Sequence, residues 1–196
     1  MNKKYFSKIS RWLHIYVSMI SFIIVLFFSI TGLTLNHADY FQKSSIITEE
    51  KGTVDTSWVI QQDTLKIKKL ELVEFFRAKY KIKGALQDFR IDDREISFSF
   101  KAPGFQADVF IEREDASYTL TITNQGIMGF VNDLHKGRDT GKVWLWIIDI
   151  SAILMTLISL TGLILLLFLK KKRLSGIVLL IIGGLISYLV YHYWGQ

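Results

Sequence analysis

The sequence predicts an α-helical membrane protein with three transmembrane helices and a small α+β domain inserted between the first two. Two observations predict this fold class. Half of the 196 residues are hydrophobic, and they gather in blocks at both ends of the chain, whereas the middle is charged and alternating. Three apolar runs each exceed the roughly 20 residues that a helix needs to cross a hydrocarbon core of about 30 Å.

The predicted spans cover residues 12–35, 143–169 and 174–194. Basic residues gather in the N-terminal segment 1–11 and fill the loop 170–173, and the positive-inside rule places both on the cytoplasmic side. The domain 36–142 and the C-terminal residues 195–196 then lie outside. The first run is too long for a cleaved signal peptide, and no small-residue cleavage site follows it, so we interpret it as a retained anchor.

Composition excludes several classes of site. The chain has no Cys, which excludes disulfides and thiolate metal sites. Its net charge of +6 follows from the basic clusters beside the spans, so we expect contact with the lipid bilayer and no binding of nucleic acid. No flavin or nicotinamide motif is present.

The inserted domain is predicted to contain one helix and a four-stranded antiparallel meander. Residues 40–60 show no clear period and are interpreted as a connecting segment. Apolar residues at helical spacing predict a helix at about 66–82, and four alternating segments between about 85 and 124 predict the strands. The predicted core comprises Leu70, Val73, Phe76, Phe89, Phe98, Phe100, Val109, Ile111, Leu120 and Ile122.

The chain has four histidines, and all of them lie at ends of the predicted spans. His37, His135 and His192 lie at outer ends, and His14 lies at the inner end of the first span. One interpretation is that an amphipathic imidazole is simply tolerated at a membrane interface. The other is axial ligation of haem, which needs neutral imidazoles on facing helices at one depth.

Geometry favours an outer haem site over an inner one. His14 and His37 are 23 residues apart, which is about 34 Å on a straight helix, so they cannot share a cofactor. Any two of His37, His135 and His192 could flank a porphyrin near the outer surface. An inner haem would need a ligand other than histidine, or His14 from a second subunit.

Two further charged residues enter the hypothesis. Asp149 lies inside the second span, where a carboxylate either packs two helices through a hydrogen bond, or orients an axial histidine or relays protons. Arg138 and Lys136, beside His135, could hold haem propionates or lipid phosphates, or could serve as ordinary interfacial anchors.

A short repeat links the first two spans. "SITGL" at Ser29–Leu33 recurs as "SLTGL" at Ser159–Leu163. Small residues in a membrane helix permit close backbone approach or leave room for a flat cofactor.

Four segments carry a family resemblance: "RWLHIYVS", "TGLTLNH", "DLHKGRDTGKVW" and "WIIDISAILMTLISLTGL". They resemble the PepSY-associated transmembrane helix proteins of bacteria, in their compact form with three spans, and the resemblance covers the chain up to about Leu169. It implies a multi-pass protein of the bacterial inner membrane with a cytoplasmic N-terminus and a periplasmic PepSY-like domain.

The resemblance also implies a function. Members of this family are found with iron acquisition, and larger relatives are similar to ferric-siderophore reductases that carry b-type haem on histidines. We therefore expect a haem protein that assists electron transfer to periplasmic substrates, with His37 and His135 as the axial pair, because both lie in the segments that carry the resemblance. His192 is the reserve ligand, and Asp149 would orient an axial histidine.

Three spans and four histidines are too few for two bis-histidine haems in one chain, so a homodimer or a larger membrane reductase partner would complete the electron path. The alternative function is a cofactor-free, membrane-anchored PepSY module that binds or regulates a partner protein.

Overall fold

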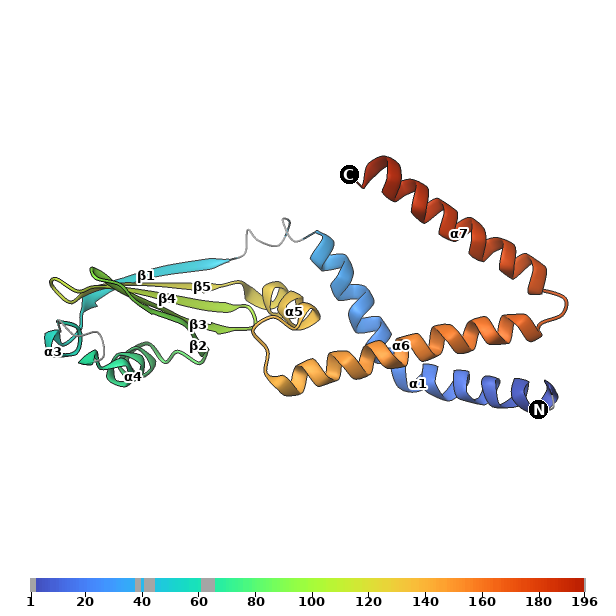
Figure 1. Ribbon diagram of the computed structural model, residues 1–196, viewed down its shortest axis with the longest axis horizontal. Coiled ribbons are helices and arrows are strands. Elements are labelled where there is room, and N and C mark those ends of the chain that lie inside the picture. The colour runs from blue at the N-terminus through green and yellow to red at the C-terminus, as the bar shows by residue number, and fades with distance from the viewer. Residues whose placement is uncertain (1–2, 38–39, 41–44, 61–65, 196) are drawn as a thin grey trace. The chain divides into compact units, whose positions relative to one another are not determined.

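The computed structural model describes residues 3–37, 40, 45–60 and 66–195. Within these residues, three helices are long and apolar enough to cross a membrane: α1 (Lys3–Asn36), α6 (Lys142–Phe168) and α7 (Arg173–Trp194) (Figure 1). This confirms the predicted three-span class. The chain divides into two compact units, which we call the first unit (residues 1–26 and 147–196) and the second unit (residues 27–146).

The second unit is built on one antiparallel sheet. Its strands are β1 (Ile46–Thr53), β2 (Ala85–Ile91), β3 (Glu95–Ala102), β4 (Phe105–Glu112) and β5 (Ser117–Asn124). The strand order is β1-β5-β4-β3-β2, so β2 to β5 form the predicted meander and β1 adds to its far edge. The turns fall at the acidic and glycine-containing breaks that separate the alternating segments in the sequence.

The prediction of four strands is wrong, because the described residues form five. β1 lies in the segment 40–60 that was interpreted as a connection, and it pairs with β5 from Ile46↔Asn124 to Thr53↔Ser117. Seven of its eight residues are exposed, so β1 lacks the apolar alternation of a strand with one covered face. Its place is fixed by backbone pairing with β5 rather than by its side chains.

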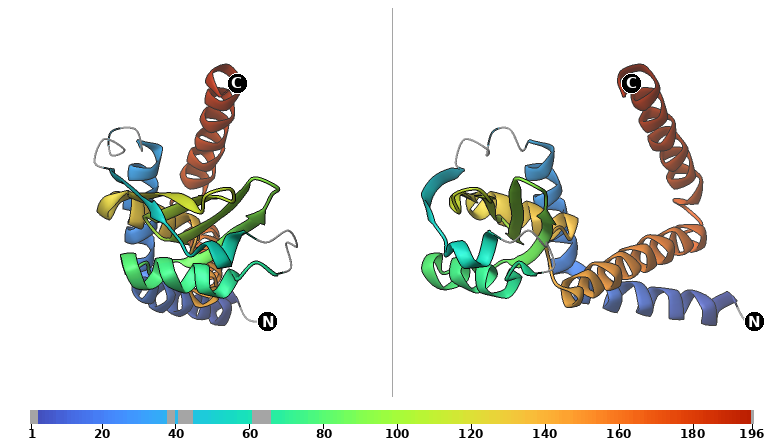
Figure 2. Two further views of the ribbon diagram at one scale, coloured as in Figure 1. Left: turned by 90° about the vertical axis from the view of Figure 1, so that its left-hand side faces the viewer. Right: turned by 60° about the vertical axis from the view of Figure 1, so that its left-hand side comes forward.

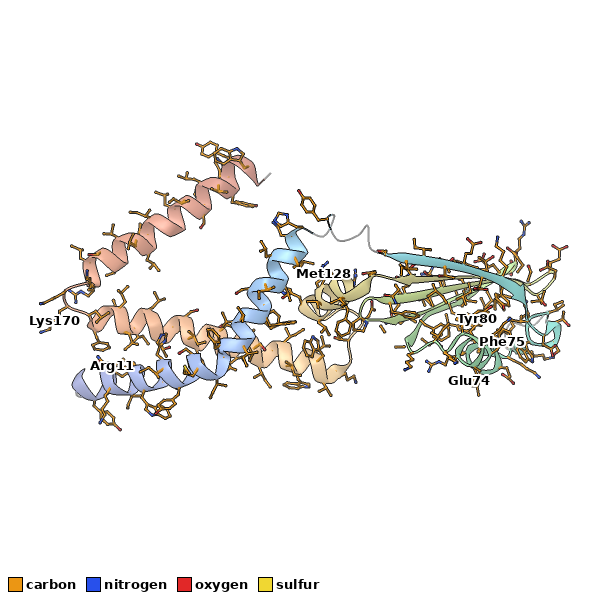
Figure 3. The ribbon with its side chains drawn as sticks, turned by 180° about the vertical axis from the view of Figure 1, so that it is seen from behind. Arg11, Glu74, Phe75, Tyr80, Met128 and Lys170 are labelled. Atoms are coloured by element: carbon orange, nitrogen blue, oxygen red, sulfur yellow. The ribbon has the colours of Figure 1, made fainter. Side chains whose placement is uncertain are left out.

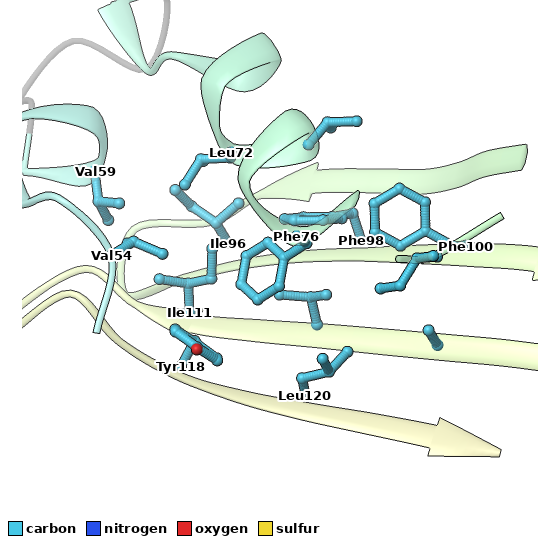
Figure 4. Packing of buried hydrophobic residues seen from close by; sticks show 14 of the residues in the cluster. Val54, Val59, Leu72, Phe76, Ile96, Phe98, Phe100, Ile111, Tyr118 and Leu120 are labelled. Carbon is cyan, nitrogen blue, oxygen red and sulfur yellow. The ribbon is translucent and has the colours of Figure 1, made fainter. Parts of the chain in front are cut away.

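One face of the sheet is covered by α4 (Lys69–Tyr80), with the short helix α3 (Thr56–Val59) beside it (Figures 1 and 2). Glu74 lies on the side of α4 that faces away from the sheet, while Phe75 and Tyr80 lie toward it (Figure 3). Phe76 is fully buried, and its ring meets the rings of Phe98 and Tyr118 at centroid distances of 5.6 and 4.8 Å (Figure 4).

The predicted helix at 66–82 is too long at both ends. It begins at Lys69 and ends at Tyr80, because Lys81 adopts a left-handed conformation with φ 54°. Its buried face is formed by Leu72, Val73 and Phe76, so the predicted core position Leu70 is wrong: its side chain is 71% exposed.

The rest of the predicted core is confirmed, with seven residues buried and two partly buried. The buried members are Val73, Phe76, Phe98, Phe100, Val109, Ile111 and Leu120. Phe89 and Ile122 are partly buried and pack against this cluster.

A further helix, which the sequence analysis did not separate from the loop before the second span, is α5 (Gly126–Lys136). It follows β5 directly and ends at Gly137, whose φ of 68° closes the helix in the left-handed conformation that glycine adopts without strain. Met128 marks this helix in Figure 3.

In the first unit, α1 and α6 pack in opposite directions. The ring of Phe6 contacts that of Phe168. His14, further along α1, contacts Thr161, which lies earlier in α6, so the two helices run antiparallel. Small side chains are buried on both helices, Ser21 on α1 and Ser151 on α6, and such residues permit close packing of membrane helices. No described residue of α7 is buried.

Candidate functional site

His135 connects α5 to the end of α1 within the second unit. Its Nδ1 lies 2.6 Å from Oγ1 of Thr31, and its ring lies 5.1 Å from the ring of Phe28. One residue along α1, a Cβ atom at Gly32 would lie 3.6 Å from Cε1 of His135. Thr31 therefore offers the imidazole a hydrogen-bond partner, and Gly32, which has no side chain, lets the ring lie close to α1. We call this arrangement the His135 site.

The Thr31 hydroxyl can select one tautomer of His135. Its Oγ1 lies 2.7 Å from the carbonyl oxygen of Phe27, which is the usual bond of a helical threonine to the preceding turn. When the hydroxyl proton goes to Phe27, Oγ1 accepts from Nδ1–H of the imidazole. A neutral His135 in that arrangement carries its free lone pair on Nε2, as in histidines that ligate metals.

A second site of the same construction lies in the first unit. Nδ1 of His14 is 2.9 Å from Oγ1 of Thr161, whose own proton goes to the carbonyl oxygen of Leu157 at 2.7 Å. A Cβ atom at Gly162 would lie 3.3 Å from Cε1 of His14. In this His14 site, the same donation by Thr161 would leave the lone pair of His14 on Nε2, and no described residue makes a hydrogen bond to Nε2 in either site.

The two threonines are the central residues of the sequence repeat. Thr31 and Thr161 occupy the same position of "SITGL" and "SLTGL", and the same shift of 130 positions carries Ser21 onto Ser151. Each repeat thus marks the place where a helix receives an imidazole. The sequence contained the repeat, but nothing in it names the histidine that each copy receives.

Asp133, two residues before His135, holds α5 against the sheet. Its side chain is only 4% exposed. Oδ2 accepts from the backbone N–H of Gly104 at 2.8 Å, in the β3–β4 turn, and Oδ1 accepts from Nε of Arg138 at 2.8 Å. A buried carboxylate needs such partners. Arg138, a candidate for haem propionates, lipid phosphates or interfacial anchoring, pairs with Asp133 within the chain.

Two side chains of α5 thus contact different parts of the second unit. Asp133 ties the helix to the β3–β4 turn, whereas His135 ties it to α1. Asn132 adds to the second contact, because its Oδ1 lies 3.1 Å from Oγ1 of Thr34. Nε1 of Trp144, in the first turn of α6, donates to the carbonyl oxygen of Leu134 at 2.8 Å. The segment "NDLHKGR" is therefore the joint between the sheet and the ends of two spans.

The contacts do not bring the expected pair His37 and His135 face to face. His37 follows the last residue of α1, is exposed, and lies with its ring 5.8 Å from that of Tyr40. His135 meets α1 at Thr31, six residues earlier, which is about 9 Å along a helix and on a different side of it.

The two other residues assigned to the site lie in the first unit. His192, the reserve ligand, is exposed in the last turn of α7 and stacks on Tyr188 with ring centroids 6.0 Å apart. Asp149 is exposed on α6 and makes no hydrogen bond or ion pair with a described residue. Neither residue contacts a second histidine among the described residues.

The donor chemistry fits one axial ligand of a haem at each site. Axial ligation needs an imidazole with Nε2 free and its other nitrogen held by a hydrogen bond, and Nδ1 of His135 and of His14 lies 2.6 and 2.9 Å from a threonine hydroxyl. A second imidazole facing either ring is not found among the described residues.

Comparison with known proteins places the chain in a family. Residues 8–195 match the family of PepSY_TM-like proteins. No curated protein and no solved structure matches the chain. The match covers the second and third candidate membrane helices, most of the first, the sheet and both histidine sites. It agrees with the resemblance carried by the "TGLTLNH" and "DLHKGR" segments. The chain belongs to the PepSY_TM-like family.

Proposed function

We propose that the chain is a haem protein of the bacterial inner membrane that assists electron transfer to periplasmic substrates. One observation carries the proposal: Nδ1 of His135 and of His14 lies 2.6 and 2.9 Å from a threonine hydroxyl that also reaches a carbonyl oxygen of its own helix. This arrangement favours Nδ1 as the donor and leaves Nε2 free. The acceptor that the family resemblance implies is a ferric chelate.

When bound, haem b supplies a one-electron iron centre. The chain's part is to hold His135 and His14 rigidly, so that Nε2 of each points away from the threonine that fixes it. Gly32 and Gly162 let each ring lie close to the helix, which defines its orientation. The axial residues proposed from the structure are therefore His135 and His14, in place of the pair His37 and His135.

A bis-histidine haem needs a second ligand at each site. We propose that a second copy of the chain, or a larger membrane reductase, supplies it. This arrangement would also give the electron path two redox centres, one for each Thr–Gly repeat.

The test is the optical spectrum of the full chain purified from haem-replete cells. The proposal predicts a Soret band that shifts on reduction with dithionite. His135→Ala and His14→Ala should each remove about half of the low-spin signal, since each removes the chain's own ligand at one of the two haem sites, and the double variant should remove all of it.

His192→Ala is the matched control, because this exposed ring stacks on Tyr188 and should leave the spectrum unchanged. His37→Ala distinguishes the two ligand assignments: loss of half the signal would restore the pair His37 and His135. Full haem content in the double variant His14→Ala, His135→Ala would end the haem assignment at these sites, and wild-type protein without haem would end the proposal.

A second candidate is a cofactor-free module that binds a partner protein, and the edge of the sheet favours it. β1 is eight residues long and pairs on one side only among the described strands, and Ile46 and Ile47 on it are 69% and 67% exposed. Such an edge can accept a strand from another chain. A discrete cross-linked adduct from a photoreactive residue at Ile46, lost in Ile47→Lys, together with the absence of haem, would support this function.

A further inference from the structure

A cavity that the proposed function does not use lies in the second unit, beside the end of α1. Its volume is about 470 Å³, within the range of small-ligand sites. Its walls include Leu35 from the last turn of α1, Ile47 from β1, Thr123 from β5, and Lys136 and Arg138 from α5 and the turn that follows it.

The free charge in this cavity is positive. Asp133 also lines it, but both of its carboxylate oxygens accept hydrogen bonds, from Gly104 and from Arg138. The pair of Asp133 and Arg138 is therefore close to neutral. Lys136 is exposed and has no ion pair or hydrogen bond among the described residues, so its ammonium group remains available to an anion.

The cavity is lined by a residue at the end of a candidate membrane span. Leu35 belongs to the candidate span Tyr5–Asn36, one residue before its end. α5 is fixed at this level by the contacts of His135 with Thr31 and of Asn132 with Thr34. Lipid phosphates lie at the ends of membrane spans, and acyl chains begin just below them. A ligand here would meet Lys136 with its charge and Leu35 with its apolar part.

We propose that this cavity holds the phosphate of an anionic phospholipid, with Lys136 as the charge partner and Leu35 against the start of the acyl chains. Basic residues at the end of a membrane span are a common way to bind anionic head groups. Such a lipid would contact both α1 and α5, and would occupy space between the two elements that the His135 site joins.

The experiment uses the full chain in phosphatidylcholine nanodiscs that contain a minor fraction of phosphatidylglycerol, with retained lipid counted by native mass spectrometry. Wild-type protein should retain phosphatidylglycerol in preference to phosphatidylcholine. Lys136→Gln should lower this preference about fivefold, the effect expected for one lysine near an anionic surface. Lys136→Arg, which keeps the charge, should preserve most of it.

Lys142→Gln is the matched control, because Lys142 is an exposed lysine six residues further along that does not line the cavity. Equal retention of the two lipids, or equal loss in Lys136→Gln and Lys142→Gln, would overturn the proposal. Displacement of the bound lipid by millimolar inorganic phosphate would show a site for a free anion and would overturn the lipid assignment. None of these readings depends on haem.

Discussion

The His135 site and the His14 site use the same Thr–Gly pair, but their imidazoles arrive by different routes. His14 belongs to α1 itself, so its contact with Thr161 joins two membrane helices. His135 belongs to α5, so its contact with Thr31 joins a membrane helix to the sheet domain. The same repeat can therefore position one histidine for helix packing and another for attachment of a domain. The two sites should therefore fail independently.

The largest expected effect is the loss of Asp133. Asp133→Ala removes the buried partner of Arg138 and of the Gly104 N–H, so α5 should loosen from the sheet and withdraw His135 from Thr31. We expect the free energy of unfolding of the second unit to fall by about 2 kcal/mol. This is less than the loss of a fully buried ion pair would cost, because Arg138 is half exposed.

Hydrogen exchange measures this outcome segment by segment. Amides of Gly126–Lys136 should exchange faster, while those around Thr161 should keep their wild-type rates. Glu74→Ala, an exposed carboxylate on α4, is the control. Equal loss of protection around Thr161 would mean that the two sites are coupled.

The opposite experiment perturbs the packing of α6 in the first unit, which contains the His14 site. Ser151→Leu places a large side chain where Ser151 is 1% exposed, and overpacking of this kind costs about 1–3 kcal/mol. Protection should fall around Leu157–Gly162 and remain high in α5. Ile153→Leu, at a position that is 60% exposed, should leave both regions unchanged. If Ser151→Leu disturbed only α5, the prediction that packing at Ser151 supports the His14 site would be wrong.

The prediction from sequence succeeded where each strand has one covered face. The alternation in β2 to β5 reports the cover of α4, which buries Phe98, Val109 and Leu120, so strands and turns could be placed without a structure. β1 was not predicted, because almost all of its side chains are exposed. Leu70 was wrongly assigned to the core, because helical spacing alone does not say where the helix begins.

The site was predicted only in part, because its contacts join residues far apart in the sequence. His135 was singled out as a histidine in a charged segment, and "SITGL" was noticed as a repeat. The bond between them joins residues 104 positions apart, and it depends on α5, which was not predicted. His37 was preferred as the partner of His135 because it lies in a segment that carries the family resemblance and at the outer end of a span.

The smallest expected effects come from the two glycines. A Cβ atom at Gly32 would lie at ordinary contact distance from His135, 3.6 Å, whereas at Gly162 it would lie 3.3 Å from His14. Gly32→Ala should change stability by less than about 0.5 kcal/mol, and Gly162→Ala should destabilise by about 0.5–1 kcal/mol, because His14 must shift. Denaturant titration in detergent measures both. A larger cost at Gly32 would contradict the difference in closeness.

The central claim is that Thr31 and Thr161 hold their imidazoles with Nδ1 as donor and Nε2 free. Nitrogen NMR of the histidine-labelled full chain, at a pH where the rings are neutral, reads the tautomer of each imidazole directly. We predict Nδ1–H and a bare Nε2 for His135 and His14. Thr31→Val should convert His135 to a mixture of tautomers and leave His14 unchanged, and Thr161→Val should do the reverse. Protonated Nε2 at both histidines in the wild-type protein would contradict the claim.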